Sequence, residues 1–392
     1  MWGNIPFNKQ AIVGDEENYV RLAIASKEWG GGGSFCRSVE AFIQSRFETP
    51  KAIVTASCTT ALDVAAILCR LEPGDEVIMP SFTFTSTANA FLLRGAKPVF
   101  VDIRPDTQNI DERLIEDAIT DRTRAICVVH YAGVSCEMDA IMEIASRRGL
   151  IVVEDAAQGV FAKYKDKWLG AIGDIGGYSF HATKNITCGE GGALLVNNKA
   201  HVARAEILCD KGTNRSEFFR GEARKYDWRD VGVSGPPSDS AAAALLAQLQ
   251  AGERVTEKRA RLFKLYQALL EPLEAAGVCR LPVIPEHCHS NHHIFYILTA
   301  DANERSRMIE HLKSANITAY FHYVPLHMSD FGAALHNNAR DLPHTVAAGT
   351  RLLRLPMYFD LTETDVTRVA SAIYDFYGIA FAENESQRAA VR

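Results

Sequence analysis

Between residues 51 and 197, short runs rich in β-branched and other apolar residues alternate with segments of helical spacing. The runs KAIVTA, DEVIMP, KPVFVDI, TRAICVVHY and LIVVEDA are separated by helical patterns such as SCTTALDVAAILCRL, DERLIEDAI and MDAIMEIASRRG. The apolar runs lack strict alternation with polar residues, which is typical of strands buried on both faces. This order of elements predicts an α/β fold with a mostly parallel sheet covered by helices.

The pattern changes in the second half of the chain. Residues 211–238 are polar, basic and aromatic, which predicts long loops. We expect one long helix over residues 239–275, then strands at HHIFYILTA and TAYFHYVPL and helices at ERSRMIEHLKSA and TETDVTRVASAIYDFYG. Residues 38–47 are also predicted to be helical. The chain is therefore expected to form a large domain over residues 1–250 and a smaller C-terminal α/β domain over residues 251–392.

Composition excludes several classes of function. The formal net charge of −6 gives no reason to expect nucleic acid or an anionic membrane as a partner. No apolar run approaches the roughly 18 residues that a membrane span needs, and the N-terminus lacks the apolar core of a signal peptide. The nine cysteines include no C-x-x-C pair, so we expect reduced thiols in a cytoplasmic protein.

Two polar residues lie at and just beyond the carboxyl end of the strand LIVVED. Asp155 ends this strand, and ligands of open α/β sheets bind beyond the carboxyl ends of strands. A carboxylate there suits a cationic ring nitrogen, such as that of pyridoxal phosphate (PLP), and Gln158 could donate to a phenolic oxygen. The alternative is an aspartate that only caps the next helix.

The segment SFHATKN places Ser179 and Lys184 on and just after another predicted strand, with no acidic residue between them. A lysine that attacks an aldehyde must be neutral, so it needs an apolar or cation-rich setting. The glycines of the following TCGEGG permit close approach of the backbone to a ligand. The alternative is an ordinary solvated surface lysine.

Two strand-to-helix turns add further polar and aromatic groups. TASCTTAL carries Ser57, Thr59 and Thr60 at a helix N-terminus, where free N–H groups and hydroxyls suit a phosphate, although plain capping is the alternative. MPSFTFTSTANA carries Phe82 and Phe84, either of which could stack on a flat ring or pack in the core.

Together, in this order, these segments are far more specific than each alone. The motifs PGDEVIMPSFTFTSTANA, HYAGVSCEMDAI, VVEDAAQG, SFHATKNITCGEGG and FHYVPLH carry a resemblance that runs over nearly the whole chain. With them the chain resembles the fold-type I PLP enzymes, and among these the DegT/DnrJ/EryC1/StrS family of sugar-nucleotide aminotransferases. The resemblance implies an aspartate aminotransferase-like fold, PLP as cofactor and a homodimer with shared active sites.

The resemblance also implies a role for individual residues. Lys184 matches the Schiff-base lysine that shuttles protons, and Asp155 matches the partner of the pyridine nitrogen. The other cofactor contacts that it implies are Gln158 at the phenolic oxygen, Thr59, Thr60 and Ser179 at the phosphate, and Phe84 stacked on the ring. By family position, Tyr323 and His327 are candidates for sugar contacts. Arg229, Arg215 and Arg220 could meet the diphosphate, with solvated loop charges as the alternative.

Three segments, RGAKPVFVDIRPDTQNIDE, KGTNRSEFFRG and KYDWRD, resemble one subgroup of the family more than the rest. That subgroup aminates dTDP-4-keto-6-deoxyglucose with glutamate, for bacterial surface polysaccharide such as enterobacterial common antigen. One segment departs from the family pattern: VSGPPSD has Gly235, Pro236 and Pro237 where the family often has an asparagine that reaches the phosphate of the neighbouring subunit. This puts the contact between subunits in doubt.

Three rival interpretations fit less well. The run HCHSNHH at residues 287–293 offers zinc ligands, but no second cluster completes a site, so we expect no metal. A Rossmann dehydrogenase would need a G-x-G-x-x-G after its first strand, and this chain has none. Its glycines at residues 30–33 precede any predicted strand. A non-catalytic relative would not be expected to keep Lys184, Asp155 and Ser179, and the sugar dehydratases of the family have histidine in place of the lysine.

Overall fold

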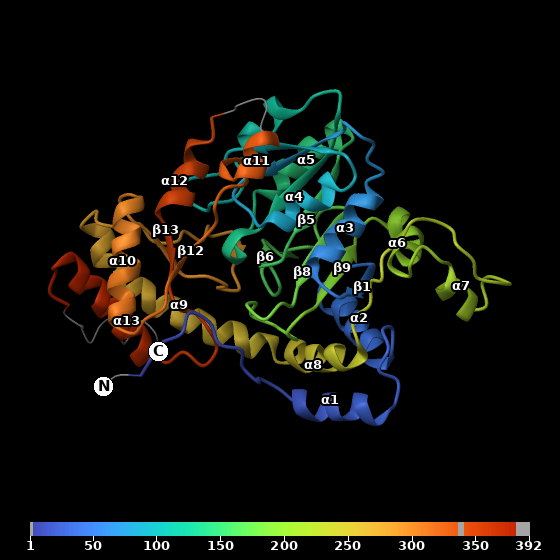
Figure 1. The fold of residues 1–392 in the computed structure, drawn as a ribbon, viewed down its shortest axis with the longest axis horizontal. Helices are drawn as coiled ribbons and strands as arrows, with labels where there is room; N and C mark the ends of the chain where they lie inside the picture. Colours follow the sequence, from blue (N-terminus) through green and yellow to red (C-terminus); the bar gives the residue numbers. More distant parts are fainter. Residues whose placement is uncertain (1–2, 336–340, 382–392) are drawn as a thin grey trace.

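A computed structural model describes residues 3–335 and 341–381 (Figure 1). Its main sheet has seven strands in the order β1-β9-β8-β5-β4-β2-β3. Their bounds are β1 Lys51–Thr55, β2 Glu76–Pro80, β3 Lys97–Val101, β4 Thr123–Val129, β5 Ile151–Asp155, β8 Ile175–Ser179 and β9 Gly192–Val196. The pairs from β8 through β5, β4 and β2 to β3 are parallel, whereas β9 is antiparallel to both of its neighbours. The predicted α/β fold with a mostly parallel sheet is confirmed.

Helices cover both faces of this sheet. One face packs on α2 (Ser34–Arg46), α5 (Met138–Arg148) and α8 (Asp239–Gln250), and the other on α3 (Cys58–Leu68), α4 (Thr85–Leu92) and α6 (Val202–Cys209). Successive strand residues face opposite cores: Val152 belongs to the first and Val153 to the second. Strands that bury both faces need apolar residues at every position, which explains the unbroken apolar runs.

The C-terminal part has its own core and a small sheet in the order β11-β13-β12. Its strands are β11 Tyr296–Leu298, β12 Tyr320–Phe321 and β13 Leu352–Arg354, and its helices are α9 Gly252–Ala275, α10 Ala302–Ser314, α11 Asp330–Leu335, α12 Pro343–Arg351 and α13 Glu363–Tyr377. Figure 1 shows α10, α12 and α13 of this part at the left of the large sheet. The expected boundary after residue 250 falls between α8 and α9 and stays a prediction, and residues 382–392 of the expected small domain lie outside the described residues.

A buried carboxylate connects the two parts. Asp102, directly after β3, accepts hydrogen bonds from the backbone N–H groups of His344 (3.0 Å) and Thr345 (2.8 Å) and from the Thr345 hydroxyl (2.7 Å). These groups lie in the first turn of α12, where N–H groups have no partner within the helix. The large domain therefore caps the helix that leads into β13.

Three sequence predictions need correction. The long helix expected over residues 239–275 is two helices, α8 and α9, which meet at Ala251, where φ is −90° and ψ is 3°. DERLIEDAI forms two short 3₁₀ helices, Glu112–Leu114 and Glu116–Ala118, rather than an α-helix. The expected loops of residues 211–238 include a short helix, α7 (Arg215–Phe219).

The remaining described elements are small or peripheral. They are α1 Glu16–Ala25, β6 Lys163–Tyr164, β7 Lys167–Trp168, β10 Cys288–His289 and three further 3₁₀ turns at Tyr131–Gly133, Lys199–His201 and Leu326–Met328. None of the helices in the described ranges combines the length and apolarity that a membrane crossing requires.

Candidate active site

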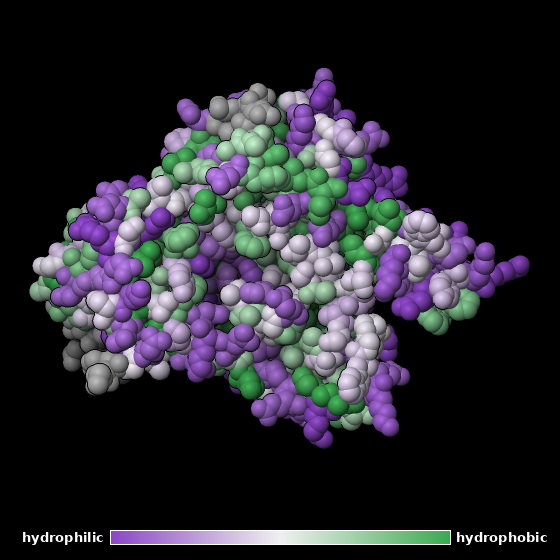
Figure 2. Space-filling view, viewed as in Figure 1, coloured by the Kyte–Doolittle hydropathy of each residue, from purple (hydrophilic) through white to green (hydrophobic). Residues whose placement is uncertain are grey.

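A cavity of about 530 Å³ opens where the large sheet meets the C-terminal part. Asp155 and Ser179, the last residues of the neighbouring strands β5 and β8, line it from the large sheet, as expected at the carboxyl ends of parallel strands. His322, Tyr323 and Arg354 line it from the small sheet and the loop after β12. Figure 2 shows the surface hollowed between the two parts, with hydrophilic residues at the entrance.

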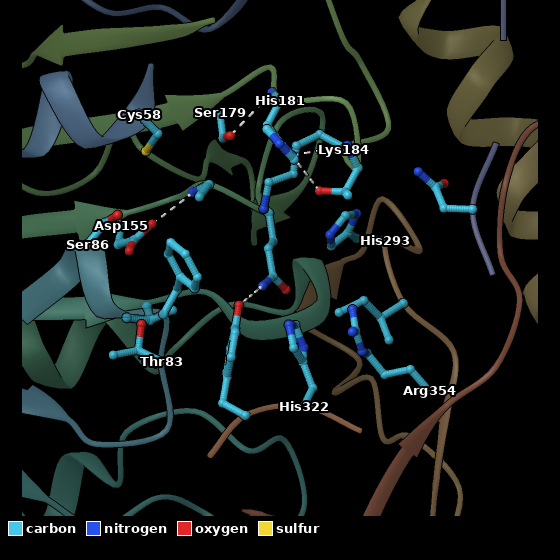
Figure 3. Close-up of a pocket in the computed structure, with 18 of the residues that line it drawn as sticks. Cys58, Thr83, Ser86, Asp155, Ser179, His181, Lys184, His293, His322 and Arg354 are labelled. Atoms are coloured by element: carbon cyan, nitrogen blue, oxygen red, sulfur yellow. Dashed lines mark hydrogen bonds between the residues drawn. The ribbon is translucent and has the colours of Figure 1, made fainter. Parts of the chain in front are cut away.

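Lys184 lies in the loop after β8 and points into this cavity (Figure 3). Its backbone N–H donates to the His181 carbonyl (2.9 Å), and Asn8 donates to the Ala182 carbonyl (3.2 Å), so the loop is fixed from two sides. Burial lowers the pKa of the Lys184 amine, although Cys58 and Asp155 act in the opposite direction. A lysine with a lowered pKa supplies the neutral amine that attack on an aldehyde requires.

The cavity holds Asp155 in one orientation. Its Oδ2 accepts from the Thr87 hydroxyl (2.6 Å), and its Oδ1 accepts from the Ala157 N–H (3.1 Å). The preceding residue, Glu154, points to the other side of β5, where it pairs with His130 (2.9 Å) and accepts backbone N–H groups. Alternation along β5 therefore decides which of the two carboxylates faces the ligand.

Hydroxyl groups and the start of α3 form an anion site at one end of the cavity. Ser57 caps α3 by accepting from the Thr60 N–H (3.1 Å), and Thr59 shares a hydrogen bond with Ser86 (2.8 Å). Ser179 reaches the cavity from β8. Gly192 lies against this turn so closely that a Cβ on it would meet the Ser57 carbonyl carbon at 2.3 Å. The arrangement suits a phosphate at the N-terminus of α3.

Two aromatic residues of the β2–α4 turn behave differently. Phe84 is 59% exposed and lines the cavity, whereas Phe82 is 1% exposed and packs in the core. An apolar ring left open to a cavity is available for stacking on a flat ligand. Across the cavity, Gln158 accepts from the Ala132 N–H (2.7 Å) and donates to the Tyr323 hydroxyl (3.0 Å).

Residues 10–374 match the family model described as the DegT/DnrJ/EryC1/StrS aminotransferase family. The chain belongs to this family. The spore coat polysaccharide biosynthesis protein SpsC of Bacillus subtilis is 32% identical over 93% of this chain and 95% of its own. A pleiotropic regulatory protein of Geobacillus stearothermophilus is 34% identical over 88% of this chain and 90% of its own. The PLP form of the putative sugar aminotransferase Spr1654 of Streptococcus pneumoniae has a TM-score of 0.88 and 25% identity over 96% of this chain and 99% of its own.

The protein is thus a PLP-dependent aminotransferase of fold type I, and its cofactor is pyridoxal 5′-phosphate. The cavity fits this group on its own geometry. The anion site at α3 suits the phosphate, the exposed Phe84 ring suits stacking, and the oriented Asp155 carboxylate suits a protonated ring nitrogen. Lys184, with its lowered pKa, suits the aldehyde.

Five residues expected to contact cofactor or substrate do not line the aminotransferase's cavity: Thr60, His327, Arg215, Arg220 and Arg229. The Thr60 hydroxyl faces the Ser57 hydroxyl (3.1 Å) inside the capping turn. The His327 ring makes a hydrogen bond with the Ser81 hydroxyl (2.7 Å) and so fixes the loop rather than facing the ligand. Arg229 pairs with Asp227 (2.7 Å) in the segment 211–238, which Figure 1 shows projecting away from the cavity.

Sequence reasoning missed several residues that do line the cavity. Ser86 belongs to the anion site, and His293, His322 and Arg354 form the side facing the C-terminal part. The signal for Arg354 was present, since one arginine interrupts the apolar run LLRLPM. The three-residue strand β13 was too short to be recognised from the sequence.

The histidine-rich run 287–293 is dispersed in the folded aminotransferase. His287 pairs with Glu137 (3.0 Å), Cys288 and His289 form β10, and His293 turns toward the cavity and Asn185 (2.8 Å). In the described part of the chain, no group of three or more His, Cys, Asp or Glu side chains is placed to hold a metal ion.

Proposed function

We propose that the protein transfers the amino group of L-glutamate to a nucleotide-linked 4-keto-6-deoxy sugar for bacterial surface polysaccharide. The substrate proposed is dTDP-4-keto-6-deoxyglucose, and the product is dTDP-4-amino-4,6-dideoxygalactose. The subgroup motifs RGAKPVFVDIRPDTQNIDE and KGTNRSEFFRG support this choice, as does the likeness to SpsC, which is named for polysaccharide biosynthesis. The observation that carries the proposal is the buried Lys184 amine with its lowered pKa, in one cavity with the oriented Asp155.

Some residues of the cavity bind the cofactor and substrates, and others hold or transfer protons. PLP, when bound, supplies an aldehyde that accepts the amino group and a ring that stabilises negative charge on the reacting carbon. Asp155 holds a proton on the ring nitrogen, because its carboxylate stabilises the cation. Lys184 Nζ would move the proton between the substrate carbon and the cofactor's aldehyde carbon, which lie on either side of the transferred nitrogen.

The walls of the cavity hold the reactants in place. Ser57, Thr59 and Ser179, with the N–H groups at the start of α3, would bind the phosphate, and the Phe84 ring would stack on the cofactor ring. Gln158 and Tyr323, joined by a 3.0 Å hydrogen bond, present donors to the phenolic oxygen and the sugar.

A substrate panel tests this proposal. The purified protein is incubated with L-glutamate and with 4-keto and 3-keto sugar nucleotides that carry dTDP, UDP or GDP, and the products are identified by NMR. We expect the dTDP-linked 4-keto sugar to give the galacto-configured amine at the highest kcat/KM. A strong preference for a UDP-linked or a 3-keto sugar would assign the same chemistry to a different substrate.

One relative raises a second candidate function. The Geobacillus stearothermophilus protein, which is 34% identical, is named a pleiotropic regulatory protein. A regulatory role without transamination is therefore the second candidate function for this chain. The two functions are distinguished by mixing the PLP-loaded protein with L-glutamate alone. Loss of the visible PLP absorbance indicates transamination, whereas a regulatory protein would keep it.

We also propose a cytoplasmic homodimer. All nine cysteines are free thiols, and eight of them are buried, which suits a reducing compartment. The segment 211–238 exposes Phe219 (74%) and Trp228 (79%) away from its own chain's core, and such aromatic residues are enriched at interfaces between proteins.

A further inference from the structure

Thr87 lies in the first turn of α4, and its hydroxyl makes a hydrogen bond that leaves its own helix. A serine or threonine inside a helix commonly donates to the carbonyl four residues before it. Thr256 in α9 and Thr350 in α12 do so, at 2.9 and 2.8 Å. Thr87 instead donates to Asp155 Oδ2 (2.6 Å) at the end of β5, 68 residues away. Its hydroxyl therefore stabilises the carboxylate and not the helix.

The direction of the hydrogen bonds around Thr87 is fixed. A hydroxyl has one proton to donate and an ionised carboxylate only accepts, so the Thr87 proton points to Asp155. The Thr83 hydroxyl, on the Asp155 side of the cavity (Figure 3), is 2.8 Å from the Thr87 hydroxyl and must then donate to it. Both threonines are buried, so water does not readily replace either contact. Thr83 and Thr87 thus direct two protons in series toward one oxygen of Asp155.

The other groups around Asp155 leave its charge to these hydrogen bonds. Its second oxygen, Oδ1, accepts from the Ala157 N–H (3.1 Å). The titratable groups that act electrostatically with Asp155 are Lys184, Cys58, Cys127 and Tyr323. Burial raises the pKa of both thiols and of the phenol, so these three groups are neutral at pH 7. Hydrogen bonds to the charged form of a carboxylate favour that form.

We propose that Thr87, supported by Thr83, is a positioning residue that keeps a proton on the ring nitrogen of PLP and off Asp155. This inference rests on the role proposed for Asp155 as the partner of that nitrogen. In a buried pair of a nitrogen and a carboxylate, the proton between them can lie on either atom, and donors to the carboxylate favour the nitrogen. The ring stabilises negative charge on the reacting carbon only while its nitrogen is protonated.

The same turn of α4 also carries the ring that faces the cofactor. Phe84 is the N-cap of α4, and its carbonyl accepts from the Thr87 backbone N–H (3.2 Å). If Thr87 only held this turn in place, its loss would displace Phe84 and weaken PLP binding. If its hydroxyl acts through Asp155, its loss changes the protonation of the ring and leaves PLP affinity nearly unchanged. The two roles are therefore separable by measurement.

The test follows the ring nitrogen directly. Wild type and variants are loaded with PLP that carries ¹⁵N in the ring, and the ¹⁵N NMR signal is recorded at pH 7 and at a series of higher pH values. Free PLP gives the reference signals of the protonated and deprotonated nitrogen. Thr87→Val removes the hydroxyl and nearly keeps the shape, whereas Thr87→Ser keeps the hydroxyl. Thr256→Val is the matched control, because it removes a helical hydroxyl outside the cavity.

We expect the wild-type signal near that of the protonated nitrogen. Thr87→Val should move it toward the deprotonated value at every pH, and Thr83→Val should move it less in the same direction. Thr87→Ser and Thr256→Val should match wild type. In single turnover with L-glutamate, Thr87→Val should lower the limiting rate about tenfold, the size expected for loss of one hydrogen bond to a charged group. The half-saturating glutamate concentration and the PLP affinity should change less than about threefold, because neither contact is made by Thr87.

Asp155→Ala separates this inference from the assignment on which it rests. If Asp155→Ala leaves the wild-type signal unchanged, the role proposed for Asp155 fails and this inference falls with it. If Asp155→Ala moves the signal and Thr87→Val does not, Asp155 keeps its role and the inference is wrong. A loss of PLP affinity in Thr87→Val with an unmoved signal would show that Thr87 only holds the turn. The NMR measurement needs no substrate, so it decides whichever amino donor the enzyme uses. If Thr87→Val does not fold, an unmoved signal in Thr83→Val would overturn the inference.

Discussion

At the scale of single residues, the chemistry depends on where the fold places charge. Lys184 is buried, which lowers the pKa of its amine, whereas the exposed lysines of the chain keep their solvation. A protonated amine cannot attack an aldehyde, so attachment of the cofactor becomes faster as pH rises toward the amine pKa and is constant above it. For Lys184 this plateau begins below the pH at which an ordinary lysine becomes neutral.

This behaviour gives the first prediction. Cofactor-free protein is mixed with PLP at a series of pH values and then reduced with borohydride, and the modified peptides are mapped after trypsin digestion. We expect the adduct on Lys184 at every pH, with a yield that levels off at a lower pH than the yield of adducts on exposed lysines, whose amines are mostly protonated below about pH 10. Lys184→Ala should show no adduct at neutral pH. A dominant adduct on another lysine would contradict the assignment.

The second prediction concerns Asp155, which is fixed by Thr87 and by the Ala157 N–H. Asp155→Ala should retain some PLP, because the anion site at α3 is unchanged, but should lose most of its turnover, on the order of 10²-fold or more in kcat. The reason is that a ring nitrogen without a carboxylate partner loses its proton and stabilises negative charge poorly. Steady-state kinetics and the PLP spectrum measure the two effects separately, and a kcat near that of wild type would show that the pyridine partner is elsewhere.

At the scale of elements, long-range capping holds the large domain together. Asp239, fully buried in the first turn of α8, accepts from the Cys36 N–H (2.8 Å) and the Phe35 N–H (3.1 Å) at the start of α2. Gly33 precedes α2, and a Cβ on it would lie 2.4 Å from the Asp239 carboxyl carbon, so only glycine admits this cap. One side chain thus closes the N-terminus of a helix some 200 residues away in sequence.

The third prediction tests this cap. Asp239→Ala leaves two buried N–H groups without a partner and should lower the free energy of unfolding by about 2 kcal/mol or more. Glu257→Ala, an exposed position on α9, is the matched control and should change it by less than about 0.5 kcal/mol. Chemical denaturation followed by circular dichroism measures both. Equal stability of the two variants would show that the cap contributes nothing.

The elements also show what the sequence can predict. The parallel sheet and its helices were predictable because strands buried on both faces need unbroken apolar runs. The break at Ala251 was not, because the helical pattern continues through it. The break depends on packing: a Cβ on Gly252 would lie 2.1 Å from the Phe161 ring, a contact between segments far apart in sequence. In DERLIEDAI the buried Ile115 and Ala118 are three residues apart, a spacing that suits the three residues per turn of a 3₁₀ helix.

The candidate site was predictable to a similar degree. Lys184, Asp155, Gln158, Ser179, Thr59 and Phe84 all line one cavity, since each follows or ends a strand of the same sheet. Thr60 directly follows Thr59, but its hydroxyl is turned toward the Ser57 hydroxyl, and the His327 ring is turned toward the Ser81 hydroxyl. Arg354 could not be placed, because its position depends on a small sheet assembled from three distant segments.

At the scale of the whole molecule, the anion site is supported by a distant segment of the same chain. The Gly235 carbonyl accepts from the Ala56 N–H (2.7 Å), one residue before Ser57, and the Gly235 N–H donates to the Cys209 carbonyl (3.0 Å). Ser238 caps α8 by accepting from the Ala241 N–H (3.3 Å). Gly235, within the segment that departs from the family pattern, thus supports the anion site of its own chain through backbone hydrogen bonds.

The fourth prediction follows for the assembled protein. We expect a homodimer whose PLP phosphate is held mainly by its own subunit, so Ser234→Ala and Ser238→Ala should change PLP affinity less than tenfold, or about 1.4 kcal/mol. Ser179→Ala should weaken it more than either. Sedimentation gives the assembly state, and PLP titration gives the affinity. A stable, active monomer, or a flanking serine that outweighs Ser179, would contradict this arrangement.

The cap that Asp102 provides for α12 limits how this protein can be recombined with its relatives. The helix that Asp102 holds leads directly into β13 and Arg354, so a residue at the edge of the large sheet sets the position of a side chain in the small one. A chimera that exchanges only residues 251–392 would carry Arg354 but not the Asp102 carboxylate that caps the helix leading to it. Transferring this wall of the cavity to another scaffold would therefore require position 102 to be transferred together with the C-terminal part.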